Sequence, residues 1–263
     1  MSESRARLAA CYRLFAWLLE RGGDIDGIEA AVVREPVLDA DVLGRPREHI
    51  GIRATRDIRP GEVLLRVPRE LTLDVHLLIK HSATHLARRP ALANFFPSRE
   101  GAVLLSGIIE SAYSDFWQPW RATLPATYLE NPGLWWSMPG TFARTIRAVE
   151  APITGYHALN ISYEATGLGQ YIREEHARFV QAYSDDPDPK HRAAVCGPRS
   201  FSWAMLTAAT RGLRHLRDPS GQGLALVPIL DLFNHDATEN VAWNLTGVGD
   251  RCLLYTSPSP RDS

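Results

Sequence analysis

The stretch VPILDLFNHD, which runs from Val227 to Asp236, sets an apolar run directly against a cluster of polar residues. The apolar run suits a buried strand, whereas Asp231, Asn234, His235 and Asp236 are costly to bury without partners. On residue types alone, three interpretations of this cluster stay open. It is a metal site built from Asp231, His235 and Asp236, a cleft in which Asn234 and His235 bind a small molecule, or a turn capped by Asp231 and Asn234.

The composition limits the class of protein. With 263 residues, 45% of them hydrophobic, the chain can bury a real core as one large domain or two ordinary ones. The 29 basic residues nearly balance the 30 acidic ones and form no obvious basic face, so we expect no binding to nucleic acid. No apolar stretch approaches the roughly 18 residues that a membrane span needs, so we expect no membrane association either.

The cysteines indicate a reducing compartment. Cys11, Cys196 and Cys252 are odd in number, lie far apart in the sequence and have neither CxxC nor metal-ligand spacing. The N-terminus also lacks the apolar region and cleavage site of a signal peptide. We therefore expect a cytoplasmic protein, with the nucleus as the alternative location, and we expect it to be a monomer.

Apolar periodicity predicts strands near both ends of the chain and helices between them. A helix is expected over Arg5–Glu20, where apolar residues recur at helical spacing, whereas residues 27–45 are ambiguous. From Ile50, the runs IGIRATRDI and EVLLRVP predict two antiparallel strands joined by a reversal at Arg59–Glu62. Helical spacing then continues, with interruptions, to about Ala182. If strands from the two ends pair in one sheet, the helical block is an insertion.

Two segments lead from the helical block to the strand that precedes Asp231. Residues 184–198, rich in Asp and Pro, predict a solvent-exposed loop. The next segment, SFSWAMLTAATRGL, predicts a capped helix with Ser200 or Ser202 as its N-cap.

Two other groups of residues have both a structural and a functional interpretation. Four tryptophans within 20 residues favour core packing between helices over ligand stacking: Trp117, Trp120, Trp135 and Trp136. His81 and His85 have the i, i+4 spacing that can bind zinc from one helix face. Because no third ligand is evident, we favour a solvated helix face over a metal site.

Four ordered motifs resemble the split SET-domain protein methyltransferases, in which a helical insertion divides the SET core. They are GIRATRDIRPGEVLLRVPREL, FWQPWRATLP, SFSWAMLTAATRG and LALVPILDLFNHD, and the resemblance extends over roughly residues 5–250. Within the family, the chain is most similar to the actin-histidine methyltransferase branch, and it is also related to the Rubisco large-subunit lysine methyltransferases.

The resemblance implies an α+β fold with small SET-type β-sheets at both ends and a large helical insertion between them. The implied segments are an N-terminal helical segment (1–45), the first part of the SET core (46–80), the insertion (81–198), the second part of the core (199–250) and a non-native tail (251–263). In this interpretation the C-terminal end of the core is missing, and the 263-residue chain is inactive and binds its cofactor weakly.

The family transfers a methyl group from S-adenosylmethionine to a side-chain nitrogen of a protein, without a metal. The positions that the resemblance assigns to cofactor binding are Arg53, Arg211, Asp231, Asn234 and His235. A guanidinium group can pair with the methionine carboxylate of the cofactor. Asp231 is expected to hold the local turn rather than to react.

The acceptor is implied to be histidine in a protein such as actin, with lysine close behind. Leu213 stands where histidine-methylating members have a polar Asn, so it is expected to line the substrate channel. The catalytic tyrosine of the family is expected downstream, and Tyr255 is not assigned to that role. The alternatives are a non-catalytic SET-like module that binds a protein and, more distantly, a metal-dependent hydrolase.

Overall fold

The structure is a computed structural model, which describes residues 3–34, 48–89, 99–126, 167–214, 224–233, 241–246 and 251–256. The helices are α1 (Glu3–Leu19), α2 (Val75–Lys80), α3 (Arg99–Glu110), α4 (Gln118–Arg121), α7 (Gly167–Ala182), α8 (Pro189–Val195) and α9 (Pro198–Arg211), with 3-10 turns η2 (Arg69–Leu71), η3 (Ser111–Tyr113) and η6 (Leu230–Leu232). The strands are β1 (Asp24–Ile25), β2 (Ile28–Arg34), β3 (Glu48–Ala54), β4 (Val63–Pro68), β5 (Leu73–Asp74), β6 (Leu213–Arg214), β7 (Leu224–Leu226), β8 (Val241–Thr246) and β9 (Arg251–Thr256).

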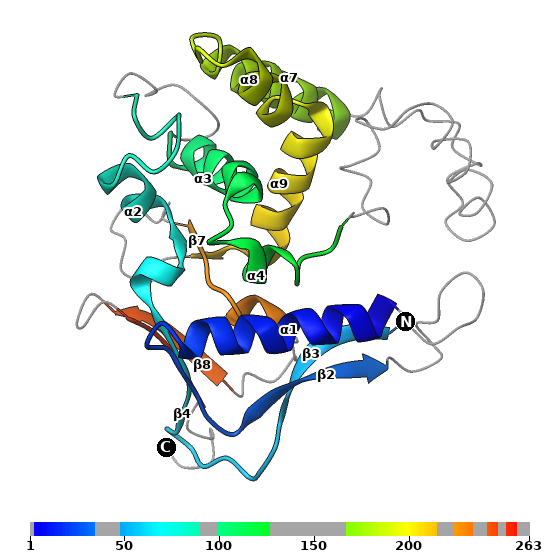
Figure 1. Cartoon of the computed structure of the whole chain (residues 1–263), viewed down its shortest axis with the longest axis vertical. Coiled ribbons are helices and arrows are strands. Elements are labelled where there is room, and N and C mark those ends of the chain that lie inside the picture. Colours follow the sequence, from blue (N-terminus) through cyan, green and yellow to red (C-terminus); the bar gives the residue numbers. More distant parts are fainter. Residues whose placement is uncertain are drawn as a thin grey trace, which may run out of the picture.

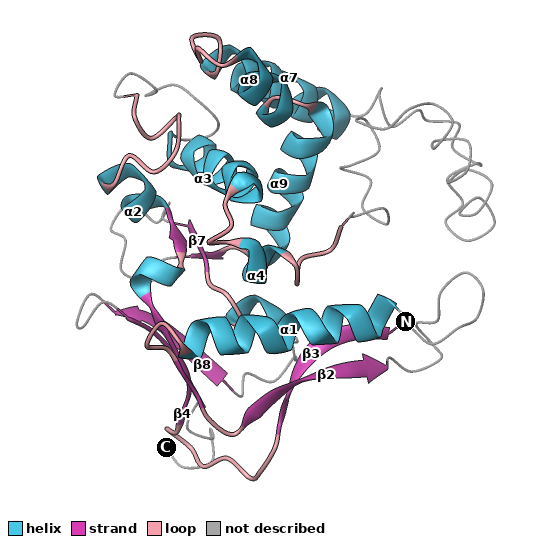
Figure 2. Ribbon diagram, in the orientation of Figure 1, coloured by secondary structure: helices cyan, strands magenta, loops and turns pink. Residues whose placement is uncertain are grey.

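Strands from the two ends of the chain pair with each other. Within the described residues the sheets have the orders β1-β4-β9-β8, β2-β3 and β5-β7-β6. The pairs β4 with β9 and β5 with β7 join the part of the chain before the helical block to the part after it. Helices α3, α4, α7, α8 and α9 lie between these strands in sequence, and α3, α7 and α8 lie above them in Figures 1 and 2. The prediction that the helical block is an insertion is therefore confirmed.

Helix α1 lies between the insertion helices and the β2-β3 hairpin (Figure 1). Its buried face, which includes Leu14 and Leu18, belongs to a hydrophobic cluster that continues through Leu65 of β4 to Phe179 of α7 and Phe201 of α9. The insertion and the strands therefore share one core. This agrees with the prediction of an amphipathic helix at the N-terminus.

The predicted pairing of the first two strands is wrong. β3 pairs with β2, which comes from the segment that the sequence left ambiguous, and β4 pairs with β1 and β9. The reversal itself is present, because the Glu62 N–H donates to the Arg59 carbonyl at 3.2 Å and Gly61 has φ 82°. A turn is a local property, whereas the partner of a strand depends on distant residues.

The segment between α7 and α9 also differs from the prediction. It contains helix α8 rather than only a loop, and the Asp188 carboxylate caps this helix by accepting from two backbone N–H groups. Helix α9 begins earlier than predicted, with Gly197 as its N-cap, so neither Ser200 nor Ser202 is the cap. The Ser200 hydroxyl donates instead to the Ala194 carbonyl at 3.0 Å.

The last strands differ from the prediction in two ways. β7 ends at Leu226, and the rest of the expected strand forms a turn, because Pro228 cannot donate to a β-ladder. Residues after Asp250 were not expected in the core, but Arg251–Thr256 form β9, which pairs with both β4 and β8. The non-native origin of residues 251–263 stays a prediction.

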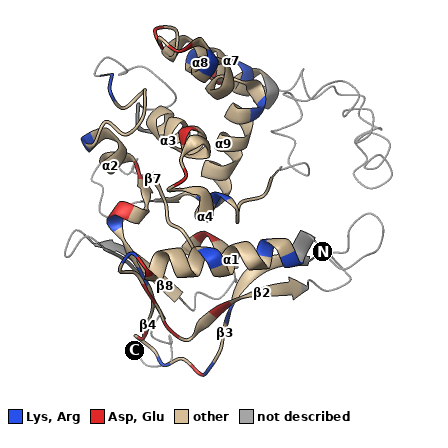
Figure 3. Ribbon diagram, in the orientation of Figure 1, with Lys and Arg blue, Asp and Glu red and all other residues tan. Residues whose placement is uncertain are grey.

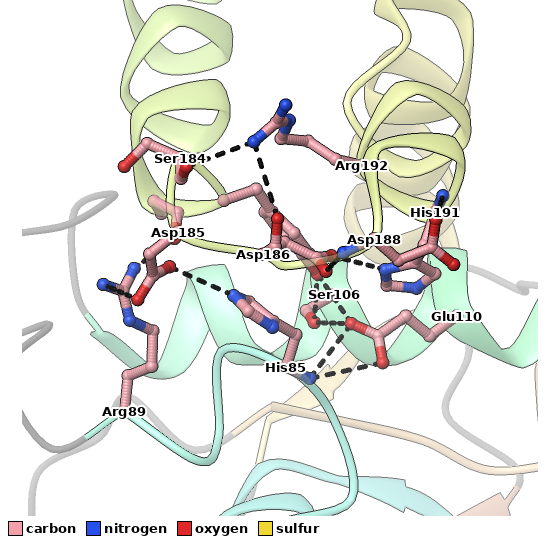
Figure 4. A network of polar contacts seen from close by, with 12 residues as sticks. His85, Arg89, Ser106, Glu110, Ser184, Asp185, Asp186, Asp188, His191 and Arg192 are labelled. Atoms are coloured by element: carbon pink, nitrogen blue, oxygen red, sulfur yellow. Dashed lines mark hydrogen bonds and ion pairs between the residues drawn. The ribbon is translucent and has the colours of Figure 1, made fainter.

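A polar network holds the insertion helices together (Figure 4). The Glu110 carboxylate of α3 accepts hydrogen bonds from the hydroxyls of Ser106 and Tyr183, each at 2.7 Å, and from the His85 N–H at 3.2 Å. Burial, followed by the charge of Glu110, raises the pKa of Tyr183 well above its usual range, so the phenol remains a donor. Because Tyr183 follows α7, the network joins α7 to α3 inside the insertion.

His81 and His85 do not lie on one helix face as predicted. Helix α2 ends at Lys80, so His81 is its C-cap and His85 lies in the following turn. The His85 ring stacks on Tyr183 with centroids 4.8 Å apart and lies 3.4 Å from Asp185. In the part of the chain that the structure describes, no group of three or more His, Cys, Asp or Glu side chains could hold a metal ion.

Charged residues of both signs are interspersed along the described elements (Figure 3). None of the described helices combines the length and the apolar character required to cross a membrane.

Candidate functional site

The turn that carries Asp231 begins with an unusual backbone conformation. Ile229 has φ 71° and ψ −44°, and its side chain is fully buried. A positive φ is rare for a β-branched residue and costs on the order of 1–3 kcal/mol. Hydrogen bonds from the N–H groups of Asp231 and Leu232 to the carbonyls of Val227 and Ile229 close the turn. The surrounding core therefore fixes the start of η6.

Asp231 connects this turn to two helices. Its Oδ2 accepts hydrogen bonds from the indole N–H of Trp120 in α4 and from Nη1 of Arg211 in α9, both at 3.3 Å, and its backbone carbonyl accepts from the same Nη1 at 2.7 Å. The side chain is completely buried. Burial raises the pKa of Asp231, and the nearby Arg211 and Trp120 offset this only in part.

One oxygen of this carboxylate is unsatisfied. Within the described residues, Oδ1 of Asp231 is buried and accepts no hydrogen bond. A buried polar atom without a partner is costly, and in native proteins such atoms occur at sites that bind a ligand or a water. Asp231 does not cap its own turn by a side-chain bond, in contrast to the capping interpretation of the sequence.

The end of α9 places Arg211 and Leu213 beside the turn. A Cβ atom on Gly212 would lie 2.4 Å from the backbone carbonyl oxygen of Ala208, so only glycine fits at this close helix end. The chain then enters β6, where Leu213 pairs with Ala225 of β7, the strand that leads to η6. Leu213 is half-buried and packs against the core.

Arg53 lies on β3, the strand that contacts η6. Its guanidinium group binds the Glu29 carboxylate on the paired strand, with Nε to Oε1 at 2.7 Å and Nη2 to the same oxygen at 2.6 Å. The Arg53 side chain is 66% exposed, so it is free of packing constraints and can exchange Glu29 for another anion.

Helix α1 places Cys11 near Asp231 and Arg211. The Cys11 thiol is buried, and burial raises its pKa to about 11, with smaller effects from the charges of Arg7, Asp231 and Arg211. The Nε of Arg7 is buried and has no hydrogen-bond partner within the described residues. Two buried polar atoms without a hydrogen-bond partner in the described residues, Nε of Arg7 and Oδ1 of Asp231, therefore belong to residues whose charges act on Cys11.

The structure thus brings together some of the predicted site residues. Arg211 and Asp231 are in contact, Leu213 follows two residues after Arg211, and Arg53 lies on the strand beside the turn. Asn234, His235 and Asp236 lie outside the described residues.

Sequence analysis missed the polar role of Trp120. The core interpretation of this residue is confirmed, because its side chain is fully buried, but its indole N–H also binds Asp231, 111 positions later in the chain. The signal that could have found it is its place in the FWQPW segment, which the resemblance had already singled out.

Comparisons with known proteins agree with this geometry. No protein-family model matches the chain. The actin-histidine N-methyltransferases of Homo sapiens and Rhinolophus ferrumequinum are each 26% identical to it over 255 residues, which are 91% of the chain and 36% of the relative. The chain therefore spans about a third of the length of the curated relatives it matches.

Among solved structures, the SET domain of LSMT bound to lysine and AdoHcy matches 95% of the chain and 51% of its own, with a TM-score of 0.58 and 19% identity. The chain has a SET-domain fold. The structure of Rubisco LSMT bound to AdoMet matches the same share of the chain with a TM-score of 0.57. The SET fold confirms the predicted α+β architecture of small sheets and a helical insertion.

Proposed function

We propose that the chain contributes the SET core of an S-adenosylmethionine-dependent protein N-methyltransferase. The observation that carries this proposal is the buried Asp231, held by Arg211 and Trp120 at the start of the Asn-His motif in a SET fold. The relatives at 26% identity are named as actin-histidine N-methyltransferases, and the similar structures hold AdoMet or AdoHcy, which supports the same activity here.

The residues of the site fit this cofactor. Its amino acid group carries one positive and one negative charge, and therefore needs an acceptor and a cationic donor. Arg53 supplies an exposed guanidinium group for the carboxylate, whereas the Asp231 carboxylate is fully buried and holds the turn that leads into the Asn-His motif. Arg211 is already bound to Asp231, so its first role is to hold that carboxylate in place. We assign Asn234 and His235 to the same cleft from the resemblance of the motif.

The cofactor supplies an electrophilic methyl group on a sulfonium, whose charge is lost in the transfer. Asp231, held by two donors, fixes the η6 turn of the site, because a buried carboxylate with defined partners has little freedom to move. The acceptor nitrogen must be neutral when it attacks. The apolar Leu213 beside the turn disfavours a charged acceptor and excludes water from the channel.

We propose histidine in actin as the first acceptor and lysine as the second. The named relatives support histidine, whereas an apolar Leu213 cannot hydrogen-bond an imidazole to fix which nitrogen faces the methyl group. If Leu213 controls this choice, Leu213→Asn should favour histidine peptides by about tenfold per hydrogen bond gained, about 1.4 kcal/mol. Equal His-to-Lys ratios for the wild type and the variant would remove Leu213 from the channel.

The function is tested by cofactor binding and by methyl transfer. Calorimetry measures the affinity of the protein for S-adenosylhomocysteine. Arg53→Gln should weaken binding about tenfold, since it removes one charge-assisted hydrogen bond, and Arg13→Gln on the exposed face of α1 serves as the matched control. Transfer is then measured by mass spectrometry of actin and of matched His and Lys peptides. Absence of cofactor binding would refute the proposal.

A reducing compartment such as the cytosol is part of the proposal. Cys11 and Cys196 are free thiols, and burial raises the pKa of each to about 11. Both thiols are therefore protonated and unreactive at neutral pH, which suits cysteines kept in the reduced state.

A further inference from the structure

A cavity lies between α3, η3, α4 and the start of α9. It has a volume of about 660 Å³. Of the predicted cofactor residues, the three that the structure describes, Arg53, Arg211 and Asp231, do not line it. Its lining combines apolar surface, such as Ile109 and Leu124, with two arginines, Arg121 and Arg199.

The two arginines face this cavity without an anionic partner. Within the part of the chain that the structure describes, neither the Arg121 nor the Arg199 guanidinium group takes part in a hydrogen bond or ion pair. No Asp or Glu is among the described residues that line the cavity. Two uncompensated cations in one concave site attract an anion more strongly than the same charges on a convex surface.

Two other polar groups of the cavity wall, on Ser200 and Trp203, are already engaged. The indole N–H of Trp203 donates to the Pro125 carbonyl at 2.9 Å, and the Ser200 hydroxyl donates to Ala194. These bonds fix the Trp203 ring as a rigid apolar wall. Helix α9 also begins here without a side-chain cap, so the positive end of its dipole adds to the field of the arginines.

We propose that this cavity binds an acidic segment of a protein partner. The carboxylates of the segment would pair with Arg121 and Arg199, and an apolar side chain between them would pack against Trp203. The volume exceeds what a single inorganic anion fills, and apolar walls favour an amphipathic peptide. Two cations are too few for the extended phosphate tracking that nucleic acid binding needs. This proposal does not rest on methyl transfer.

The test is direct binding of a peptide to the 263-residue chain without cofactor. The probe is a fluorescein-labelled, end-blocked hexapeptide of the order Asp, Glu, Phe, Asp, Leu, Glu, and its control carries Asn and Gln in place of the acids. Fluorescence anisotropy should show binding of the acidic peptide and at least about tenfold weaker binding of the neutral one. Arg121→Gln and Arg199→Gln should each weaken binding about fivefold, whereas Arg13→Gln should have no effect.

A charge reversal separates specific binding from damage to the fold. Arg121→Glu with Arg199→Glu should lose the acidic peptide and bind a version in which Lys replaces each acid. The cavity is not a peptide site if both peptides bind equally, or if the wild type prefers inorganic phosphate or a single-stranded oligonucleotide. If Arg121→Gln and Arg199→Gln both bind the acidic peptide as tightly as the wild type, the peptide binds elsewhere on the chain. This result would also overturn the proposal.

Discussion

The pair of Arg211 and Asp231 allows the sharpest test of the site. In Arg211→Met, the aliphatic side chain retains most of the arginine stem and removes the guanidinium group. Asp231 then loses the donor to its Oδ2 and the donor to its backbone carbonyl, and keeps only the indole N–H of Trp120. The carboxylate is completely buried, whereas 15% of the Arg211 side chain is exposed. Removal of the arginine thus leaves an uncompensated buried charge.

The expected loss of unfolding free energy in Arg211→Met depends on whether Asp231 takes up a proton. Breaking a buried ion pair costs about 3–5 kcal/mol of unfolding free energy. The penalty is limited because Asp231 can take up a proton, and protonating an ordinary aspartate costs about 4 kcal/mol at pH 7 and about 1.5 kcal/mol at pH 5. We therefore expect Arg211→Met to lower the free energy of unfolding by about 3–4 kcal/mol at pH 7. At pH 5 the unpaired charge of Asp231 should lower it by at most about 1.5 kcal/mol.

The sign of the pH dependence is fixed by the direction of the pKa shift. Burial already raises the pKa of Asp231, and loss of Arg211 raises it further. Between the unfolded and the folded pKa, the folded state binds more protons than the unfolded state, so stability falls as the pH rises through this window. The variant should therefore be closest to the wild type in acid and furthest from it at neutral pH.

Urea unfolding followed by circular dichroism at pH 5 and pH 7 measures these differences. The double variant Arg211→Met with Asp231→Leu should recover at least half of the loss at pH 7, since it removes both charges. Arg53→Met is the matched control, because its partner Glu29 lies at the surface and the pair contributes less than about 1 kcal/mol. The reasoning is refuted if Arg211→Met costs the same at both pH values, or no more than Arg53→Met.

Three further predictions concern neighbouring features. Trp120→Phe keeps the buried ring but removes the bond to Asp231, so urea unfolding should show a loss of about 1 kcal/mol beyond the cavity left by the smaller ring; an equal loss in a background of Asp231→Leu would contradict this. The ring of His191 contacts the Asp186 carboxylate at 2.6 Å. Burial raises the pKa of Asp186, but the His191 contact, the Asp188 N–H and the charges of His191 and His85 together lower it overall. Its contribution to stability is full above the unfolded pKa and is lost as the pH falls through the folded pKa, so Asp186→Asn should lower the thermal midpoint at pH 7 but hardly at about pH 2; a gap that persists in acid argues against the pair. Gly212→Ala forces the end of α9 to shift and should cost about 2 kcal/mol in urea unfolding, and a neutral result would show that the helix end is looser than the structure has it.

Local features of the fold were predictable from the sequence, and partners distant in sequence were not. The helical spacing before Gly22 predicted α1 to within a few residues, and the turn at Gly61 was found because its chemistry is local. The partner of β3 was missed, because β2 and β4 are both suitable strands and only tertiary packing selects between them.

The candidate site was predictable for a different reason. Nothing in the periodicity placed Arg211 beside Asp231, and both were selected through the resemblance of their motifs. The hydrogen bond of Trp120 was not predicted, because an indole in an apolar segment indicates a core residue. The bond also depends on Asp231, which lies in a distant motif. The left-handed φ of Ile229 has no sequence signal either, since this residue type normally avoids it.

The pairing of β4 with β9 has a consequence for synthesis of the protein on the ribosome. Val63 pairs with Tyr255, so the four-stranded sheet cannot close until the whole insertion and the part of the chain up to β9 have been translated. At about 5–20 residues per second, β4 waits on the order of ten seconds with an unpaired edge. During that time α3 and α9 complete much of their own packing, while the strand edge is exposed to other nascent chains. A chaperone that shields this edge should therefore raise the yield of folded protein more than one that acts after release.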